Sequence, residues 1–228
     1  MPTDKPGDNF ELELRDVWKQ LTQSIMRSRT AFESFGAAIR DPDSPDDGQL
    51  ARSAESYEWE ESRAHESATE SLGRLLENAQ KGRRTALLSA AWRAVGDLEH
   101  IAECGRRGWT LAIRESEGKY AFSDEARKDA EKLSGHLEEL FYWTLEAMRL
   151  RCGDGEGQQP EAGAIAKKEG EIARRILDKT AAECAKGHEA RSADGSCAIP
   201  GGVAFLDYIA TVSRVARHLS TLLELSGL

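Results

Sequence analysis

The segment LEHIAEC at residues 98–104 aligns without a gap with the segment VSRVARH at residues 212–218. Apolar residues fall at the same places in both segments, and the register continues upstream, where Val95 falls on Ile209 and Trp92 on Leu206. The shift between the two segments is half of the 228 residues. The alignment therefore predicts a tandem of two like units, in which these segments are matching helices.

The rest of the chain divides into helical stretches around these two. Apolar residues recur at three- and four-residue steps, as on one helix face, and the six prolines all fall outside the periodic stretches. Ser123 before Asp124 and Glu125 is typical of a helix start. The predicted helices cover residues 10–40, 49–80, 84–114, 123–152, 161–186 and 203–225, with a loop at 187–202. The sequence thus predicts an all-α protein of two pseudo-symmetric three-helix bundles, with residues 1–118 and 119–228 as the two repeats of one domain.

Charge and hydropathy exclude several classes of protein. The net charge is −9 and the pI is about 5.2, so nucleic acid and anionic membrane surfaces would repel the chain. No apolar run reaches the roughly 18 residues of a membrane-spanning helix, and residues 1–9 lack the apolar core of a signal peptide. The four cysteines form no CxxC motif. These features predict a cytoplasmic protein with reduced thiols, no nucleic-acid binding and no direct membrane insertion.

Short motifs in both halves are similar to those of one known family. The segment GDLEHIAE at residues 96–103 resembles the signature Asp-Leu-Glu-Arg-Ile-Gly-Asp-His of PhoU-like domains. The second half carries four further motifs in the order seen in PhoU-like domains attached to sodium/phosphate cotransporters, namely Leu177-Asp178, His188 with Arg191, Gly195 with Cys197, and Leu206-Asp207. The chain therefore resembles the PhoU-like family, known as phosphate-uptake regulators, over most of its length.

The resemblance implies two pseudo-symmetric three-helix bundles and a role in controlling phosphate transport or signalling. The implied partner is a phosphate transporter or a sensor kinase, with any place at the membrane held through the transporter. The positions that match family motifs are Asp97, Leu98, Ile101, His188, Arg191, Cys197, Asp207 and His218. We expect His188, Arg191 and Cys197 to order the loop before the last helix.

Some PhoU-like proteins bind iron or zinc through a Glu/Asp-x-x-x-Asp pair in each half, and Glu99 and Glu103 stand at the first pair here. Carboxylates four residues apart share a helix face and could converge on one cation. The second pair is replaced by Ser213 and Arg217, and arginine cannot bind a cation because it stays protonated. Iron or zinc is therefore expected in the first half only, with Asp178 as a further candidate ligand.

Other interpretations of the same charges stay open. Glu99 and Glu103 fit an ordinary solvated helix face, on which Glu103 would pair with Arg107. Arg217 could substitute for the charge of a lost metal by balancing carboxylates.

Asp97 likewise fits more than one arrangement. It could pair with Arg93, four residues before it, or lie with His100 and Cys104 on one face at spacings compatible with zinc. No fourth zinc ligand is evident in the sequence.

We expect most of the tryptophans to lie in the core or at an interface. Trp18, Trp92, Trp109 and Trp143 lie on apolar helix stripes. Trp59 lies between two glutamates on a polar helix, so it is a candidate for an exposed contact.

Catalytic motifs are missing from the sequence. It holds no GxxxxGK[ST] loop, no strand-associated GxGxxG and no GxSxG elbow. The predicted function is therefore a non-catalytic regulator or adaptor that acts by protein contact. Two alternatives stay open. One is a metal-dependent helical-bundle enzyme, which would need Glu-x-x-His ligand pairs; only Glu61 and His65 come near this spacing, and they are four residues apart instead of three. The other is a helical scaffold unrelated to phosphate. A homodimer would bury any apolar helix stripe that the single chain leaves uncovered.

Overall fold

The computed structural model describes residues 6–41, 47–77, 83–153, 160–193 and 199–227, and all regular structure in these residues is helical. The helices are α1 (Pro6–Arg40), α2 (Asp47–Glu77), α3 (Arg83–Ser116), α4 (Asp124–Cys152), α5 (Pro160–Ala193) and α6 (Ile199–Ser226). The all-α prediction is confirmed. None of these described helices combines the length and the apolar character that crossing a bilayer requires.

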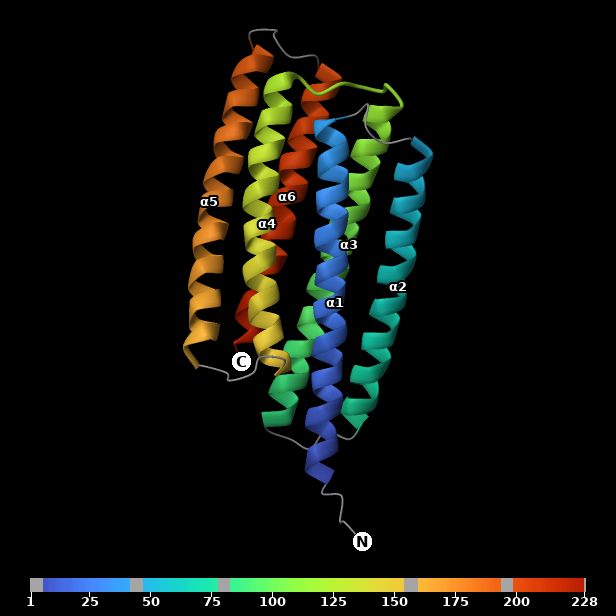
Figure 1. Cartoon of the computed structure of the whole chain (residues 1–228), viewed down its shortest axis with the longest axis vertical. Coiled ribbons are helices and arrows are strands. Elements are labelled where there is room, and N and C mark those ends of the chain that lie inside the picture. Colours follow the sequence, from blue (N-terminus) through green and yellow to red (C-terminus); the bar gives the residue numbers. More distant parts are fainter. Residues whose placement is uncertain (1–5, 42–46, 78–82, 154–159, 194–198, 228) are drawn as a thin grey trace.

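The helices run up and down and pack as two triads (Figure 1). Helices α1, α2 and α3 pack against one another, and α4, α5 and α6 do the same. The triads meet where α1 contacts α4 and α3 contacts α6, which leaves α2 and α5 at opposite edges (Figure 1). The two predicted three-helix bundles are therefore present. The predicted repeat boundary between residues 118 and 119 falls in the turn between α3 and α4, and the division of the domain at that point stays a prediction.

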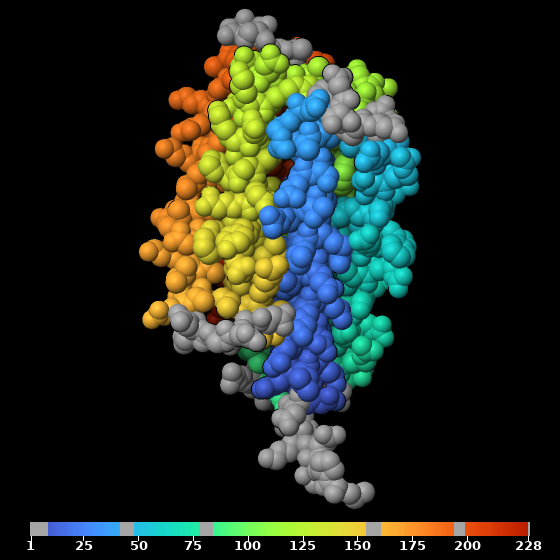
Figure 2. Space-filling view, viewed as in Figure 1, coloured from blue at the N-terminus to red at the C-terminus, as the bar shows by residue number. Residues whose placement is uncertain are grey.

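Aromatic rings of α1 connect the cores of the two bundles. Phe32 and Phe35 of α1 pack edge to face with their centroids 4.7 Å apart. Phe35 meets Trp109 of α3 at 6.0 Å, and Phe32 meets Phe141 of α4 at 5.8 Å. Figure 2 accordingly shows α1 between α4 and α2 on the face in view. The continuous core holds α3 against α6, where most of the predicted site residues lie.

A buried ion pair joins the two bundles at one end. Arg127 of α4 donates to Glu115 of α3 at 2.6 Å and to the backbone carbonyl of Ile39 at the end of α1. The backbone N–H of Phe122 donates to the same Glu115 oxygen at 3.1 Å. Glu115 is only 6% exposed, and burial raises the pKa of its carboxyl. Arg127 and Glu115 together thus connect the end of α1, the end of α3 and the start of α4.

The helix ends confirm one prediction and correct another. The side chain of Ser123 accepts a hydrogen bond from the backbone of Ala126, as expected of an N-cap. The loop predicted at residues 187–202 is wrong, because α5 continues to Ala193 and α6 begins at Ile199. Gly201 serves close packing in α6 rather than a turn, since a Cβ there would lie 2.3 Å from the carbonyl oxygen of Ala121. The predicted breaks near residues 42–46, 78–82 and 154–159 lie outside the described residues.

The tryptophans follow the prediction with one exception. Those that are buried or packed against the core are Trp18, Trp109 and Trp143. Trp92 is the exception to the core placement: it is 49% exposed, and the interface position that was the alternative for it stays a prediction. On this turn of α3 the inward positions belong to Ala91 and Val95, and Trp92 points away from the core.

Candidate functional site

The glutamates predicted as metal ligands lie on the outer surface of α3. Glu99 and Glu103 are both exposed. A carboxylate oxygen of Glu103 lies 3.7 Å from Nδ1 of His100, and Glu99 lines a groove beside α2. Within the described ranges, no three His, Cys, Asp or Glu side chains gather in a way that could hold a metal ion. The described residues around Glu99 and Glu103 therefore supply too few donors to enclose iron or zinc by themselves.

We expect purified protein to hold less than one equivalent of iron or zinc per chain. Two exposed carboxylates would leave most of the coordination shell to water, which favours release. Elemental analysis after incubation with either metal and desalting measures this, with Glu99→Gln/Glu103→Gln as the matched control for background metal. A full equivalent that disappears in the control variant would contradict the expectation and restore the metal site.

The motif residues Asp97 and His218 meet across the contact between α3 and α6. Oδ1 of Asp97 lies 2.7 Å from Nδ1 of His218, and the two side chains are 15% and 20% exposed. The predicted pairing of Asp97 with Arg93 is therefore wrong, because Asp97 pairs with the second half of the chain. The His218 ring also stacks on His100, with 4.9 Å between centroids. Two imidazoles and a carboxylate thus form one polar contact between the bundles.

A second pair joins the same two helices further along. Arg107 donates through Nε and Nη2 to Asp207, both at 2.7 Å. Arg107 is therefore engaged across the helix contact, and its predicted pairing with Glu103 is wrong. Asp97 and Arg107 are ten residues apart, close to three helical turns, so both face α6. The motif residues Leu98 and Ile101 are buried in the core at 5% and 0% exposure.

Asp178 lies away from these groups. It is on α5, where its two oxygens share the one N–H of Arg174 Nε, each at 2.9 Å. Because α5 packs against α4 and α6 and not against α3, the fold does not bring Asp178 to the glutamates of α3. Its surroundings are those of an ordinary surface ion pair on one helix.

His188 and Arg191 lie on the last turns of α5 rather than in a loop. That they order the segment before the last helix stays a prediction. His188 is 2% exposed and packs edge to face on Phe205 of α6 at 5.6 Å, and burial lowers the pKa of its imidazole. Arg191 lies 3.3 Å from Asp129 of α4. Both side chains connect α5 to its neighbours. Cys197 lies outside the described residues.

Arg217 is exposed on α6, next to His218. No carboxylate in the part of the chain that the structure describes lies within ion-pair distance of it. A direct ion pair therefore does not provide the charge balance predicted for Arg217.

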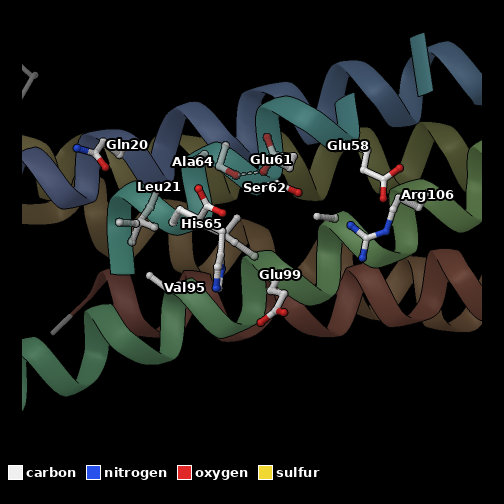
Figure 3. A pocket seen from close by; sticks show the side chains of 15 residues that line it. Gln20, Leu21, Glu58, Glu61, Ser62, Ala64, His65, Val95, Glu99 and Arg106 are labelled. Atoms are coloured by element: carbon white, nitrogen blue, oxygen red, sulfur yellow. Dashed lines mark hydrogen bonds between the residues drawn. The ribbon is translucent and has the colours of Figure 1, made fainter. Parts of the chain in front are cut away.

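A groove that sequence reasoning missed opens between α2 and α3 over α1, with a volume of about 380 Å³. Figure 3 shows His65 and Glu99 near its middle, and Glu58 and Arg106 toward one end. The polar sequence of α2 gives no indication of a groove. Among the described side chains of α2 one carboxylate is buried beside this groove, and because its burial depends on contacts with α1, the sequence held no signal for it.

That carboxylate belongs to Glu61, which is 5% exposed. It accepts hydrogen bonds from Ser24 on one oxygen and from Nε of Arg27 at 2.7 Å on the other. Both oxygens are therefore engaged by α1. A metal held by Glu61 and His65, as the enzyme alternative requires, would have to displace these bonds.

The helix arrangement defines the class of this protein as an antiparallel six-helix bundle made of two packed triads. PhoU from Pseudomonas aeruginosa has the same arrangement, with a TM-score of 0.79 and 15% identity over 95% of this chain and 96% of that one. A PhoU-like phosphate regulatory protein from Shewanella oneidensis MR-1 aligns with a TM-score of 0.60 and 11% identity over 96% and 97%. No protein-family model and no curated protein matches the sequence. The chain has the PhoU-like fold, and the resemblance seen in the sequence is confirmed at the level of the fold.

Proposed function

We propose that the chain is a member of the PhoU-like family and a non-catalytic regulator of phosphate transport or phosphate signalling. The observation that carries the proposal is the likeness to PhoU from Pseudomonas aeruginosa over 95% of the chain. The name of the Shewanella oneidensis protein, a phosphate regulatory protein, supports the phosphate connection. Asp97 and His218, both at positions that match family motifs, meet across the contact between α3 and α6, which is consistent with the proposal.

The polar groups also favour a non-catalytic role. General acid–base chemistry uses a carboxyl or imidazole that is positioned in a pocket and free to exchange a proton. The buried carboxylates of Glu61 and Glu115 are held by arginines, and Glu99 and Glu103 are exposed to water. These side chains stabilise the fold or remain solvated, as in an adaptor protein.

Exposed apolar side chains offer a surface for protein contact. Ile199, Val203 and Leu206 lie at i, i+4 and i+7 on α6 and are 81%, 63% and 39% exposed. Residues at this spacing share a helix face. On α2, Trp59 is 61% exposed, with the guanidinium of Arg63 5.0 Å from its ring centroid. We propose that the face of α6 formed by Ile199, Val203 and Leu206 contacts a phosphate transporter or a phosphate-sensing kinase. Such a contact would bring the chain to the membrane without insertion.

Direct binding to the phosphate transporter or sensor kinase of the same genome tests this function. We expect the purified chain to bind one of them, and Val203→Ser/Leu206→Ser to weaken binding about tenfold or more, because buried apolar anchors dominate such contacts. Biolayer interferometry with the transporter in nanodiscs, or with the kinase domain, gives the affinities.

Ile165→Ser provides the control, because Ile165 is also exposed, at 52%, but lies on α5. This variant should bind like the wild type. Absence of binding to either partner would overturn the proposed function. Light scattering tests whether a second copy of the chain occupies this face instead. If the wild type is a dimer and Val203→Ser/Leu206→Ser is a monomer, the face is assigned to the dimer contact.

A further inference from the structure

A second cavity, of about 380 Å³, lies between α3 and α6 and is rich in arginine. Its charged lining consists of Arg106, Arg107, Arg114 and Glu103 from α3, with Asp207 and Arg214 from α6. Four cations and two carboxylates therefore line one space, and Arg106 also lines the groove beside α2. The whole chain shows the opposite balance, with 31 lysines and arginines against 40 aspartates and glutamates.

Helical spacing explains why these side chains share the cavity. Arg107 and Arg114 are seven residues apart on α3, and Asp207 and Arg214 are seven residues apart on α6. Seven residues make almost two helical turns, so each pair projects from one face. The ion pair between Arg107 and Asp207 fixes the two faces against each other at 2.7 Å.

The two carboxylates neutralise only part of the positive charge of the arginines. Asp207 is engaged by Arg107. The side chain of Glu103 is 67% exposed and lies 3.7 Å from His100. Across the described ranges, no carboxylate lies within ion-pair distance of Arg106, Arg114 or Arg214. The cavity therefore holds a surplus of guanidinium groups.

The thiol beneath the cavity adds no negative charge. Cys104 is 4% exposed, and burial raises the pKa of its thiol, so it stays protonated at neutral pH. The positive charges of Arg214, Arg107 and Arg106 act on the thiol in the opposite direction. Cys104 and arginines from both helices thus line the same cavity.

We propose that this cavity binds an oxyanion of the phosphate class, carrying two or more negative charges. Guanidinium groups donate paired N–H groups in a planar fork that matches phosphate oxygens. A single carboxylate or chloride would neutralise only one of the unpaired arginines. The volume accommodates a small phosphorylated molecule or a short phosphate chain as well as orthophosphate. This binding site goes beyond the proposed regulatory function and does not depend on it.

Calorimetric titration with orthophosphate and with inorganic triphosphate tests the site, at an ionic strength held constant with sodium chloride. We expect binding to the wild type, and a loss of about tenfold in affinity for Arg114→Gln and for Arg214→Gln, because each removes a charged hydrogen-bond donor. Tighter binding of triphosphate than of orthophosphate would assign the cavity to phosphate chains. The reverse order would assign it to the free ion.

Arg175→Gln is the matched control, because it removes the same charge from an exposed position on α5, which does not contact α3. It should bind like the wild type. Equal affinity in all three variants would overturn the proposal, since only bulk charge would then matter. Absence of binding to either anion at millimolar concentration would also overturn it and leave the arginines as a contact for an acidic protein surface. Neither result would affect binding of a transporter or kinase through α6.

Discussion

Replacement of Arg127 by methionine is expected to lower the free energy of unfolding by about 3–5 kcal/mol, the usual cost of removing one partner of a buried ion pair. Arg127 donates to Glu115 at 2.6 Å and to the carbonyl of Ile39. Glu115 is 6% exposed, and its second oxygen has no partner among the described residues. Methionine would therefore leave a buried carboxylate that keeps only the backbone N–H of Phe122. Urea unfolding followed by circular dichroism measures the loss.

The free energy of unfolding that is lost on replacing Arg127 should be larger at high pH than at low pH. Burial raises the pKa of Glu115 in the folded protein above its ordinary value. The folded state therefore holds a proton over a range in which the unfolded state has lost it, and stability falls as pH rises through that range. Without Arg127 the ionised carboxylate is disfavoured further. We expect the difference between Arg127→Met and the wild type to be larger at pH 8 than at pH 5.

Two further variants separate this explanation from a general effect of lost arginine. Glu115→Gln/Arg127→Met should regain part of the lost stability, because a neutral amide is less costly to bury than an unpaired carboxylate. Arg149→Met removes an exposed pair with Glu146, 49% and 35% exposed, and should change stability by less than about 0.5 kcal/mol. A cost below about 1 kcal/mol for Arg127→Met would show that the pair contributes little.

Local patterns explain why the helices were predictable from the sequence. Apolar periodicity and the place of proline depend only on neighbouring residues, and the N-cap at Ser123 is a contact within four residues. The prediction was wrong where the same local signal fits two different structures. The glycines of residues 187–202 indicated a loop, but Gly201 permits a close approach of α6 to the backbone at Ala121.

Contacts between the halves were not predictable in the same way. The sequence identified Asp97, Asp207 and His218 as motif positions, but the partners of these side chains depend on the register of α3 against α6. Sequence spacing suggested partners four residues away on the same helix, for Arg107 as well as for Asp97. Arg107 and Asp97 instead pair with residues about one hundred positions or more away in the sequence, because α6 covers the faces of α3 on which they lie. The arginine-lined cavity was missed for the same reason.

Replacement of Phe35 by alanine is expected to cost about 3–5 kcal/mol, the usual range for truncating a buried aromatic side chain. Phe35 is 1% exposed and packs on Phe32 at 4.7 Å and on Trp109 at 6.0 Å between ring centroids. Its ring also covers Gly108, where a Cβ would lie 2.3 Å from the ring. Truncation would therefore leave a cavity where α1 crosses α3. Urea unfolding measures the cost.

A double-mutant cycle with Gly108→Ala shows whether close packing is the cause. In the wild type the added methyl group collides with the Phe35 ring and should cost about 1–3 kcal/mol, despite the better helix propensity of alanine. In the Phe35→Ala background the same methyl group enters the cavity, so the substitution should become neutral or stabilising. Gly135→Ala is the control, because a Cβ there meets nothing within 4 Å and should add up to about 1 kcal/mol in either background. An equal effect of Gly108→Ala in both backgrounds would mean that α1 and α3 are not held together by this contact.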